Sequence, residues 1–116
     1  MNNWKNIRLE LAQSPEFPTG SVSRVYLIRV PLDDNDLVDE ASLLKSPNLA
    51  TARRHWSTDP DEAGLVQKVD GALAMSCNGT YARVLRLDGR PIRLGQQISV
   101  VEPDGAVLGF RIASIR

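Results

Sequence analysis

The residues best suited to chemistry lie together in TARRHWSTDPDE, residues 51–62. This segment holds the only histidine of the chain, His55, an arginine pair, Arg53 and Arg54, and one of two tryptophans, Trp56. Guanidinium groups bind carboxylates and phosphates through paired hydrogen bonds, and an imidazole exchanges protons near neutral pH. The segment is therefore a candidate for anion binding or for acid–base catalysis.

Catalysis here requires partners for His55. Asp59 or Asp61 has the chemistry of an orienting carboxylate, and Cys77 has that of a nucleophile. However, no glycine-framed elbow surrounds a serine, and Cys77 precedes a tight-turn signal, as a small core residue does. We therefore predict no catalytic residue and prefer a noncatalytic interpretation to an unrecognised enzyme.

Composition narrows the metal and cofactor chemistry. With one cysteine and one histidine, a single chain forms neither a disulfide nor a cysteine cluster nor a site with two imidazoles. The acidic run that begins at Asp33 does not match a calcium-binding EF-hand loop, because Val38 stands at the glycine position and Leu44 at the glutamate position. The sequence predicts no metal ligand and no cofactor.

A structural interpretation explains residues 51–56 without a substrate. On a β-strand, Ala52, Arg54 and Trp56 share one face, while Arg53 and His55 share the other. Trp56 then fills the edge of a core. Because the two arginines lie on opposite faces, at most one of them is free to contact a partner.

The acids that follow match the start of a helix. Asp59 is placed to cap it, Pro60 to take its first position and Glu62 to complete the capping box, with Gly64 as the stop. We therefore predict that these acids cap a short helical turn.

A second group of arginines follows Tyr81, at Arg83, Arg86, Arg90 and Arg93. A basic patch with a stacking aromatic is typical of single-strand nucleic-acid binding on a small barrel. One strand would place Arg83 and Arg86 on opposite faces, which weakens that patch. The candidate ligand-binding residues of the whole chain are Arg53, Arg54, His55, Tyr81, Arg83 and Arg86.

Charge is balanced overall but unevenly distributed. Residues 33–62 hold eight acids against three bases, and the remainder holds six acids and eleven bases. Zero net charge argues against strong nonspecific nucleic-acid binding, and eleven arginines against three lysines suit carboxylate or phosphate partners. Pairing between the acidic middle and the basic flanks within the chain is the preferred explanation.

The elements that must position these residues are mostly strands. Residues 5–12 alternate, with Ile7, Leu9 and Leu11 on one face. Residues 22–30 also predict a strand, with Val25 and Leu27 opposite Arg24 and Tyr26, and Asp39 is placed to cap a helix over residues 40–46.

Turn signals predict three hairpins. Asn78-Gly79 favours a two-residue turn that pairs Cys77 with Thr80 and Met75 with Ala82, and Asp88-Gly89 predicts a turn before a strand at residues 91–94. Pro103-Asp104-Gly105 predicts a turn that pairs Glu102 with Ala106. That register also sets Val100 opposite Leu108 and Ile98 opposite Phe110, and it gathers these side chains with Ile112 on one face.

These elements predict a mainly β fold: a small barrel or sandwich of antiparallel strands and hairpins with one short helix around residues 39–46. Residues 1–116 form a single domain. No apolar run is long enough to span a bilayer, and residues 1–13 do not read as a signal peptide, so we expect a cytoplasmic protein without a membrane partner. A protein partner, or a second copy of the chain, would dock on residues 22–30 or 107–116 if either lies at a sheet edge.

The segments DEASLL (residues 39–44), ARRHW (52–56) and LGQQISVVEPDGAVLGFRIASIR (94–116) together resemble a family of small, uncharacterised bacterial proteins of about this length. The resemblance covers most of residues 22–116. It implies an Arg-Arg-aromatic-Trp run at residues 53–56, where His55 takes the aromatic position, and this argues against an essential imidazole. It implies no catalytic or ligand residue. The expected function is noncatalytic binding or protein interaction; the alternative is arginine-mediated binding of nucleic acid or a small anion.

Overall fold

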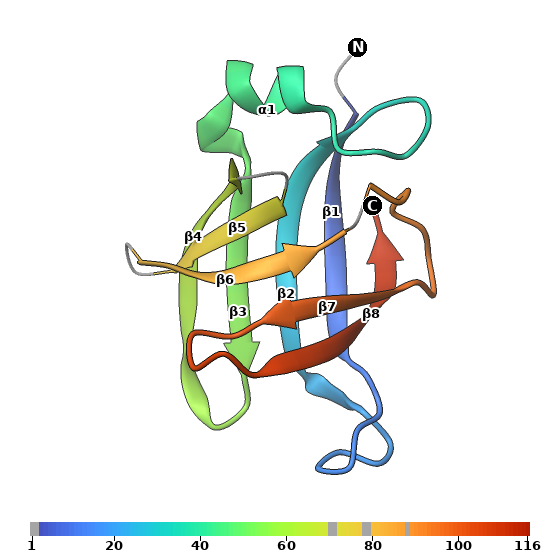
Figure 1. The fold of residues 1–116 in the computed structure, drawn as a ribbon, viewed down its shortest axis with the longest axis vertical. Helices are drawn as coiled ribbons and strands as arrows, with labels where there is room; N and C mark the ends of the chain where they lie inside the picture. Colours follow the sequence, from blue (N-terminus) through green and yellow to red (C-terminus); the bar gives the residue numbers. More distant parts are fainter. Residues whose placement is uncertain (1–2, 70–71, 78–79, 88) are drawn as a thin grey trace.

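The chain closes into a barrel of antiparallel β-strands with one short helix at its end (Figure 1). The computed structural model describes residues 3–69, 72–77, 80–87 and 89–116, without the side chains of residues 77 and 80–82. The strands are β1 (Asn3–Leu11), β2 (Ser21–Leu32), β3 (Thr51–Trp56), β4 (Asp59–Val69), β5 (Ala72–Cys77), β6 (Thr80–Arg86), β7 (Gln97–Val101) and β8 (Val107–Ile115). The helix α1 (Glu40–Lys45) and the 3-10 turn η1 (Pro47–Leu49) connect β2 to β3. The prediction of a mainly β barrel or sandwich is confirmed, and the architecture is the barrel.

Closure removes the sheet edges on which a docking strand was expected. The strands follow chain order around the ring, and β8 returns to pair with β1. β2 lies between β1 and β3, and β8 lies between β7 and β1. The condition for strand docking on residues 22–30 or 107–116, a position at a sheet edge, is therefore not met by β2 or β8. A partner of either strand must contact side chains on the outer surface.

The barrel interior is filled by residues that alternate along the strands, as closure requires. In β1 the predicted face, which carries Ile7, Leu9 and Leu11, is buried. In β2 the side chain of Tyr26 is buried, whereas Leu27 faces outward with 38% of its surface exposed. The largest fully buried side chains are Ile7, Leu9, Val25, Tyr26, Val30, Val66, Leu73, Met75, Leu85, Ile98, Phe110 and Ile112. Most of them lie on the inner face and form one hydrophobic core.

The hairpin of β7 and β8 has the predicted register. The amide of Glu102 donates to the carbonyl of Ala106 over 2.7 Å, and Ile98 lies opposite Phe110. Gly105 has φ of 87°, the left-handed conformation that the turn requires. Turn chemistry and alternation agree here, which is why the register could be read from the sequence.

The hairpin of β5 and β6 has the predicted pair of Cys77 with Thr80 but departs from the predicted register beyond it. Met75 pairs with Arg83 instead of Ala82, because a bulge shifts the pairing between Met75 and Ser76. The Asn78-Gly79 turn itself lies outside the described residues. The bulge matters for the interior, since it brings Arg83 onto the face that points into the barrel.

The helical turn predicted from Asp59 to Gly64 does not form. Residues 59–69 are strand β4, and Gly64 pairs with Ala52 in β3. The capping pattern is local, whereas the strand gains two neighbours, β3 and β5, along its length. Glu62 consequently lies beside Arg54 on the inner face instead of capping a helix.

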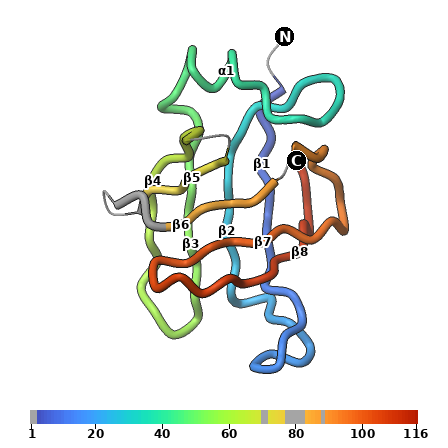
Figure 2. The backbone as a smooth tube through the Cα atoms, in the orientation of Figure 1, coloured from blue at the N-terminus to red at the C-terminus, as the bar shows by residue number. Residues whose placement is uncertain are grey.

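The short helix is where the sequence placed it. The Asp39 carboxylate accepts a hydrogen bond from the amide of Ser42 over 3.2 Å, and α1 ends at Lys45. Residues 91–94 form no strand, contrary to the prediction. Instead, residues 89–96 connect β6 to β7 without a strand (Figure 2). Ile92 in this segment is buried in the core, and its amide donates to the Asp36 carbonyl.

Candidate functional site

The two arginines of β3 lie on opposite faces of the strand, as predicted. Arg54 lies on the inner face beside Glu62, and its side chain is only 12% exposed. Arg53 lies on the outer face, between Leu27 of β2 and Ala63 of β4. The two arginines therefore have different surroundings, one inside the barrel and one on its outer surface.

An ion-pair cluster occupies one end of the barrel interior. Arg83 Nε donates to Glu102 Oε2 over 3.0 Å, and its Nη2 donates to Glu62 Oε2 over 3.1 Å. Glu62 also accepts from Arg54 Nη1 over 3.4 Å. The Tyr26 hydroxyl donates to the same Glu102 carboxylate over 3.0 Å. The side chains of Arg83 and Glu102 are each 11% exposed, so this cluster is largely shielded from water.

Aromatic rings cover this cluster from the core side. The rings of Tyr26 and Phe110 meet edge to face at 5.1 Å, and Trp56 lies 6.2 Å from both. The Arg54 guanidinium lies over the Trp56 ring at 4.2 Å. Trp56 packs against the core, as predicted. Burial, and then the neighbouring Glu102 carboxylate, raise the pKa of the Tyr26 hydroxyl far above its usual range.

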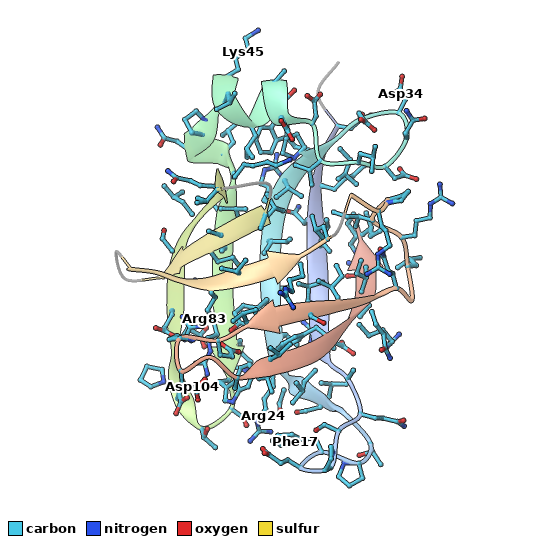
Figure 3. The ribbon with its side chains drawn as sticks, in the orientation of Figure 1. Phe17, Arg24, Asp34, Lys45, Arg83 and Asp104 are labelled. Atoms are coloured by element: carbon cyan, nitrogen blue, oxygen red, sulfur yellow. The ribbon has the colours of Figure 1, made fainter. Side chains whose placement is uncertain are left out.

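Further arginine and aromatic contacts continue toward the loops at this end. Arg24 lies over the Phe17 ring at 4.4 Å, and Figure 3 shows both residues at the same end of the barrel as Arg83 and Asp104. Arg54 Nη1 also lies 3.5 Å from Asp59. In this interior cluster each described carboxylate contacts a cation or a donor. The cluster therefore joins β2, β3, β4, β6 and the turn that follows β7, and it presents little uncompensated charge to a ligand.

The outer face of the barrel holds a groove of about 640 Å³. It crosses β8, β1, β2, β3 and β4, of which β1, β2 and β3 pass behind β6 and β7 in Figure 1. The residues that line it are Asn6, Ile7, Arg8, Leu27, Ile28, Arg29, Thr51, Ala52, Arg53, Ala63, Gly64, Ser114 and Arg116. Four of these are arginines, and no aspartate or glutamate is among them.

Strand pairing sets the order of side chains across the groove. Arg8 of β1 pairs with Leu27 of β2, and Leu27 pairs with Arg53 of β3. Small residues end this row on both sides, Ser114 beside Arg8 and Ala63 beside Arg53. The row therefore places one exposed leucine between two arginines, with little bulk at either end.

The remaining two arginines lie in the next row. Arg29 pairs with Asn6, whose backbone also exchanges two hydrogen bonds with Arg116, at 2.7 and 2.9 Å. The Arg29 side chain contacts Asn6 Oδ1 at 3.4 Å and lies 5.8 Å from the Trp4 ring. This second row adds positive charge beside Leu27.

The groove arginines differ in how far their charge is already compensated. Arg8 pairs with Glu10 at 2.8 Å and donates to the Val22 carbonyl over 3.0 Å. Within the described part of the chain, the side chains of Arg53 and Arg116 form no hydrogen bond or ion pair. Arg53 is also exposed, so its guanidinium has all its donors free for an anion.

The other predicted site residues do not join the groove. His55 Nδ1 lies 2.8 Å from Asp61 Oδ1, and this exposed pair stands on the outer face one row beyond Arg53. Arg86 is exposed on β6, which lies four strands from β2 around the ring. The side chain of Tyr81 lies outside the described residues, as does that of Cys77. Among the candidate residues whose side chains the structure describes, only Arg54 and Arg83 share a partner, the Glu62 carboxylate.

Sequence reasoning missed three of the four groove arginines, namely Arg8, Arg29 and Arg116. The signal was present in part, because Arg8 and Arg29 both fall on the outward positions of strands whose alternation is plain. What the sequence did not supply was the order of strands around the barrel, which brings β8, β1, β2 and β3 side by side.

Three of the eight acids in residues 33–62 are paired with bases of the flanking segments, which supports in part the explanation preferred from composition. Glu62 pairs with Arg83, Glu40 with Lys68, and Asp36 with Arg93 at 3.7 Å. These pairs lie away from the groove lining. Of the groove arginines, Arg8 is paired with Glu10, whereas Arg29, Arg53 and Arg116 form no ion pair with the described residues.

Comparison with known proteins assigns no family to this arrangement. No protein-family model matches the chain, and searches of curated proteins and of solved structures found no match. Among the described residues, no helix has the length and apolar character needed to cross a membrane.

Proposed function

We propose that the protein is a noncatalytic binding domain whose outer groove holds an anionic ligand. The observation that carries this proposal is the lining: four arginines converge from β1, β2, β3 and the residue that follows β8, without an aspartate or glutamate among the lining residues. Guanidinium groups that converge on a concave surface bind carboxylates and phosphates through charge-assisted hydrogen bonds. The volume of about 640 Å³ is in the range of small-molecule sites.

A small anion suits the groove better than a nucleic-acid strand. Single-strand binding combines a basic groove with aromatic rings on which bases stack. No aromatic residue is among the lining residues, although the Arg29 guanidinium lies 5.8 Å from the Trp4 ring. The lining supplies charge and one large exposed apolar side chain, Leu27, but no aromatic ring on which a base could stack.

The proposal is tested by calorimetric titration of the protein with inorganic pyrophosphate at low salt. We expect Arg53→Ala to weaken binding by about tenfold or more, because a hydrogen bond to a charged group contributes about 1.5–3 kcal/mol. Arg86→Ala is the matched control, since it removes one exposed arginine from the opposite side of the barrel. Binding should also weaken as salt is raised.

Two results would contradict the proposal. One is the absence of pyrophosphate binding by the unmodified protein at low salt. The other is an equal loss of pyrophosphate affinity in Arg53→Ala and Arg86→Ala. Such a result would mean that pyrophosphate is attracted by the overall charge of the protein and does not bind in the groove. Arg53 and Arg86 are both exposed, so we expect both variants to fold like the unmodified protein. Urea unfolding curves of the two variants check this.

A further inference from the structure

Leu27 is the apolar residue at the centre of the groove. It lies between Arg8 and Arg53 in one cross-strand row, and 38% of its surface is exposed. A leucine surrounded by arginines gains stability when an apolar group covers it, by about 25 cal/mol for each Å² removed from water. The centre of the groove therefore favours a different chemistry from its two sides.

We infer that the groove recognises a dianion whose two anionic groups are joined by an apolar chain. This inference rests on the proposed function and adds the class of ligand. One anionic group binds at Arg53, the other binds at Arg8 and Arg116 on the opposite side, and the apolar chain lies over Leu27.

The spacing of the row sets the length of such a ligand. Neighbouring strands lie about 4.8 Å apart, so the backbones of Arg8 and Arg53, two strand spacings apart, are separated by about 10 Å. The small side chains of Ser114 and Ala63 leave both ends of the row open. Anionic groups at the ends of an extended chain of about this length reach both arginines at once.

The arginines on the two sides of the groove differ in how firmly other groups of the protein hold them. Glu10 and the Val22 carbonyl hold the Arg8 guanidinium through Nε and Nη2, so that side is preorganised. Arg53 has no such partner among the described residues and adjusts to the second anionic group. A monoanion satisfies only one side, whereas a dianion gains charge-assisted hydrogen bonds on both.

The experiment is a calorimetric titration with alkane dicarboxylates of increasing length, from succinate through adipate and suberate to sebacate, at low salt. Octanoate is the monoanionic control for suberate, and a diether dicarboxylate of equal length controls for the apolar chain. We expect suberate to bind about tenfold more tightly than octanoate or succinate, which corresponds to one additional charge-assisted hydrogen bond. The diether should bind more weakly than suberate.

Two variants locate the effect. Arg53→Ala should lower the affinity for suberate to that for octanoate, because only one anionic group then remains bound. Leu27→Ser should weaken suberate binding several-fold and leave pyrophosphate binding unchanged, since pyrophosphate has no apolar chain to cover the leucine. Arg86→Ala should change neither affinity.

The outcomes separate this inference from the proposed function. If octanoate binds as tightly as suberate, or if Leu27→Ser binds suberate as well as the unmodified protein does, the dianion inference is overturned while pyrophosphate binding that depends on Arg53 still stands. If neither pyrophosphate nor any dicarboxylate binds in an Arg53-dependent way, the proposed function and the inference both fail.

Discussion

Replacing Arg83 with methionine is the sharpest test of the interior of this barrel. Arg83 donates to Glu102 over 3.0 Å and to Glu62 over 3.1 Å, and its side chain and that of Glu102 are 11% exposed. Methionine fills part of the same volume but leaves the Glu102 carboxylate with only the Tyr26 hydroxyl. Glu62 keeps Arg54 at 3.4 Å, so most of the cost falls on Glu102.

Removing one partner of a buried ion pair costs about 3–5 kcal/mol. Measured by urea unfolding, with a dependence of about 2 kcal/mol per M, this loss lowers the midpoint by about 1.5–2.5 M. Arg86→Met is the matched control on the same strand. It removes an exposed arginine, and we expect it to change the free energy of unfolding by about 0.5 kcal/mol or less.

A second variant shows whether the orphaned carboxylate is the cause. Adding Glu102→Gln to Arg83→Met removes the buried charge and keeps an acceptor for Tyr26, so the double variant should be more stable than the single one. A loss below about 1 kcal/mol in Arg83→Met would refute the reasoning, because it is far smaller than the cost of an uncompensated buried charge. A double variant less stable than the single variant would refute it equally.

Three further predictions concern the core, the alkaline limit and the turns. Phe110→Ala should lower the free energy of unfolding by about 3–5 kcal/mol, because Phe110 is fully buried; an unchanged thermal midpoint would contradict its place in the core. The pKa of Tyr26 is raised in the folded state, so its contribution to the free energy of unfolding is present below the unfolded pKa of about 10 and is lost as the pH rises above that value. The urea midpoint should therefore fall between about pH 8 and about pH 11, and it should fall less in Tyr26→Phe than in the unmodified protein. Gly20→Ala should destabilise more than Gly105→Ala: both glycines have positive φ, but only at Gly20 would a Cβ lie 2.7 Å from the Leu11 carbonyl oxygen, and similar melting temperatures would contradict this account.

The parts of the fold that the sequence predicted are those where local chemistry and alternation agree. The β7–β8 register follows from Gly105 in the turn and from the apolar face that Ile98 and Phe110 share. The Asp39 cap likewise depends only on residues within one turn of the helix.

The errors arose where distant partners outweigh local signals. Asp59 and Glu62 have the spacing of a capping box, yet pairing with β3 and β5 makes this segment a strand. Glu62 then meets Arg83, which lies far along the chain and points inward only because of a bulge. Neither the bulge nor the long-range ion pair is encoded in residue spacing.

The candidate site was predictable in its chemistry and only partly in its location. The excess of arginine indicated carboxylate or phosphate partners, and opposite faces for Arg53 and Arg54 are confirmed. The convergence of Arg8, Arg29 and Arg116 on Arg53 depends on barrel closure, which joins the last strand to the first. Closure is a property of the whole chain and has no local signature.

The most direct test of the central claim is a map of amide chemical-shift changes during titration with pyrophosphate at low salt. The groove predicts that the largest changes cluster on the central strands of its lining, at Arg8, Leu27, Arg29 and Arg53, and that amides near Arg86 and Glu102 change little. Changes that cluster elsewhere on the barrel, or none at saturating pyrophosphate, would contradict the assignment of this groove as the binding site.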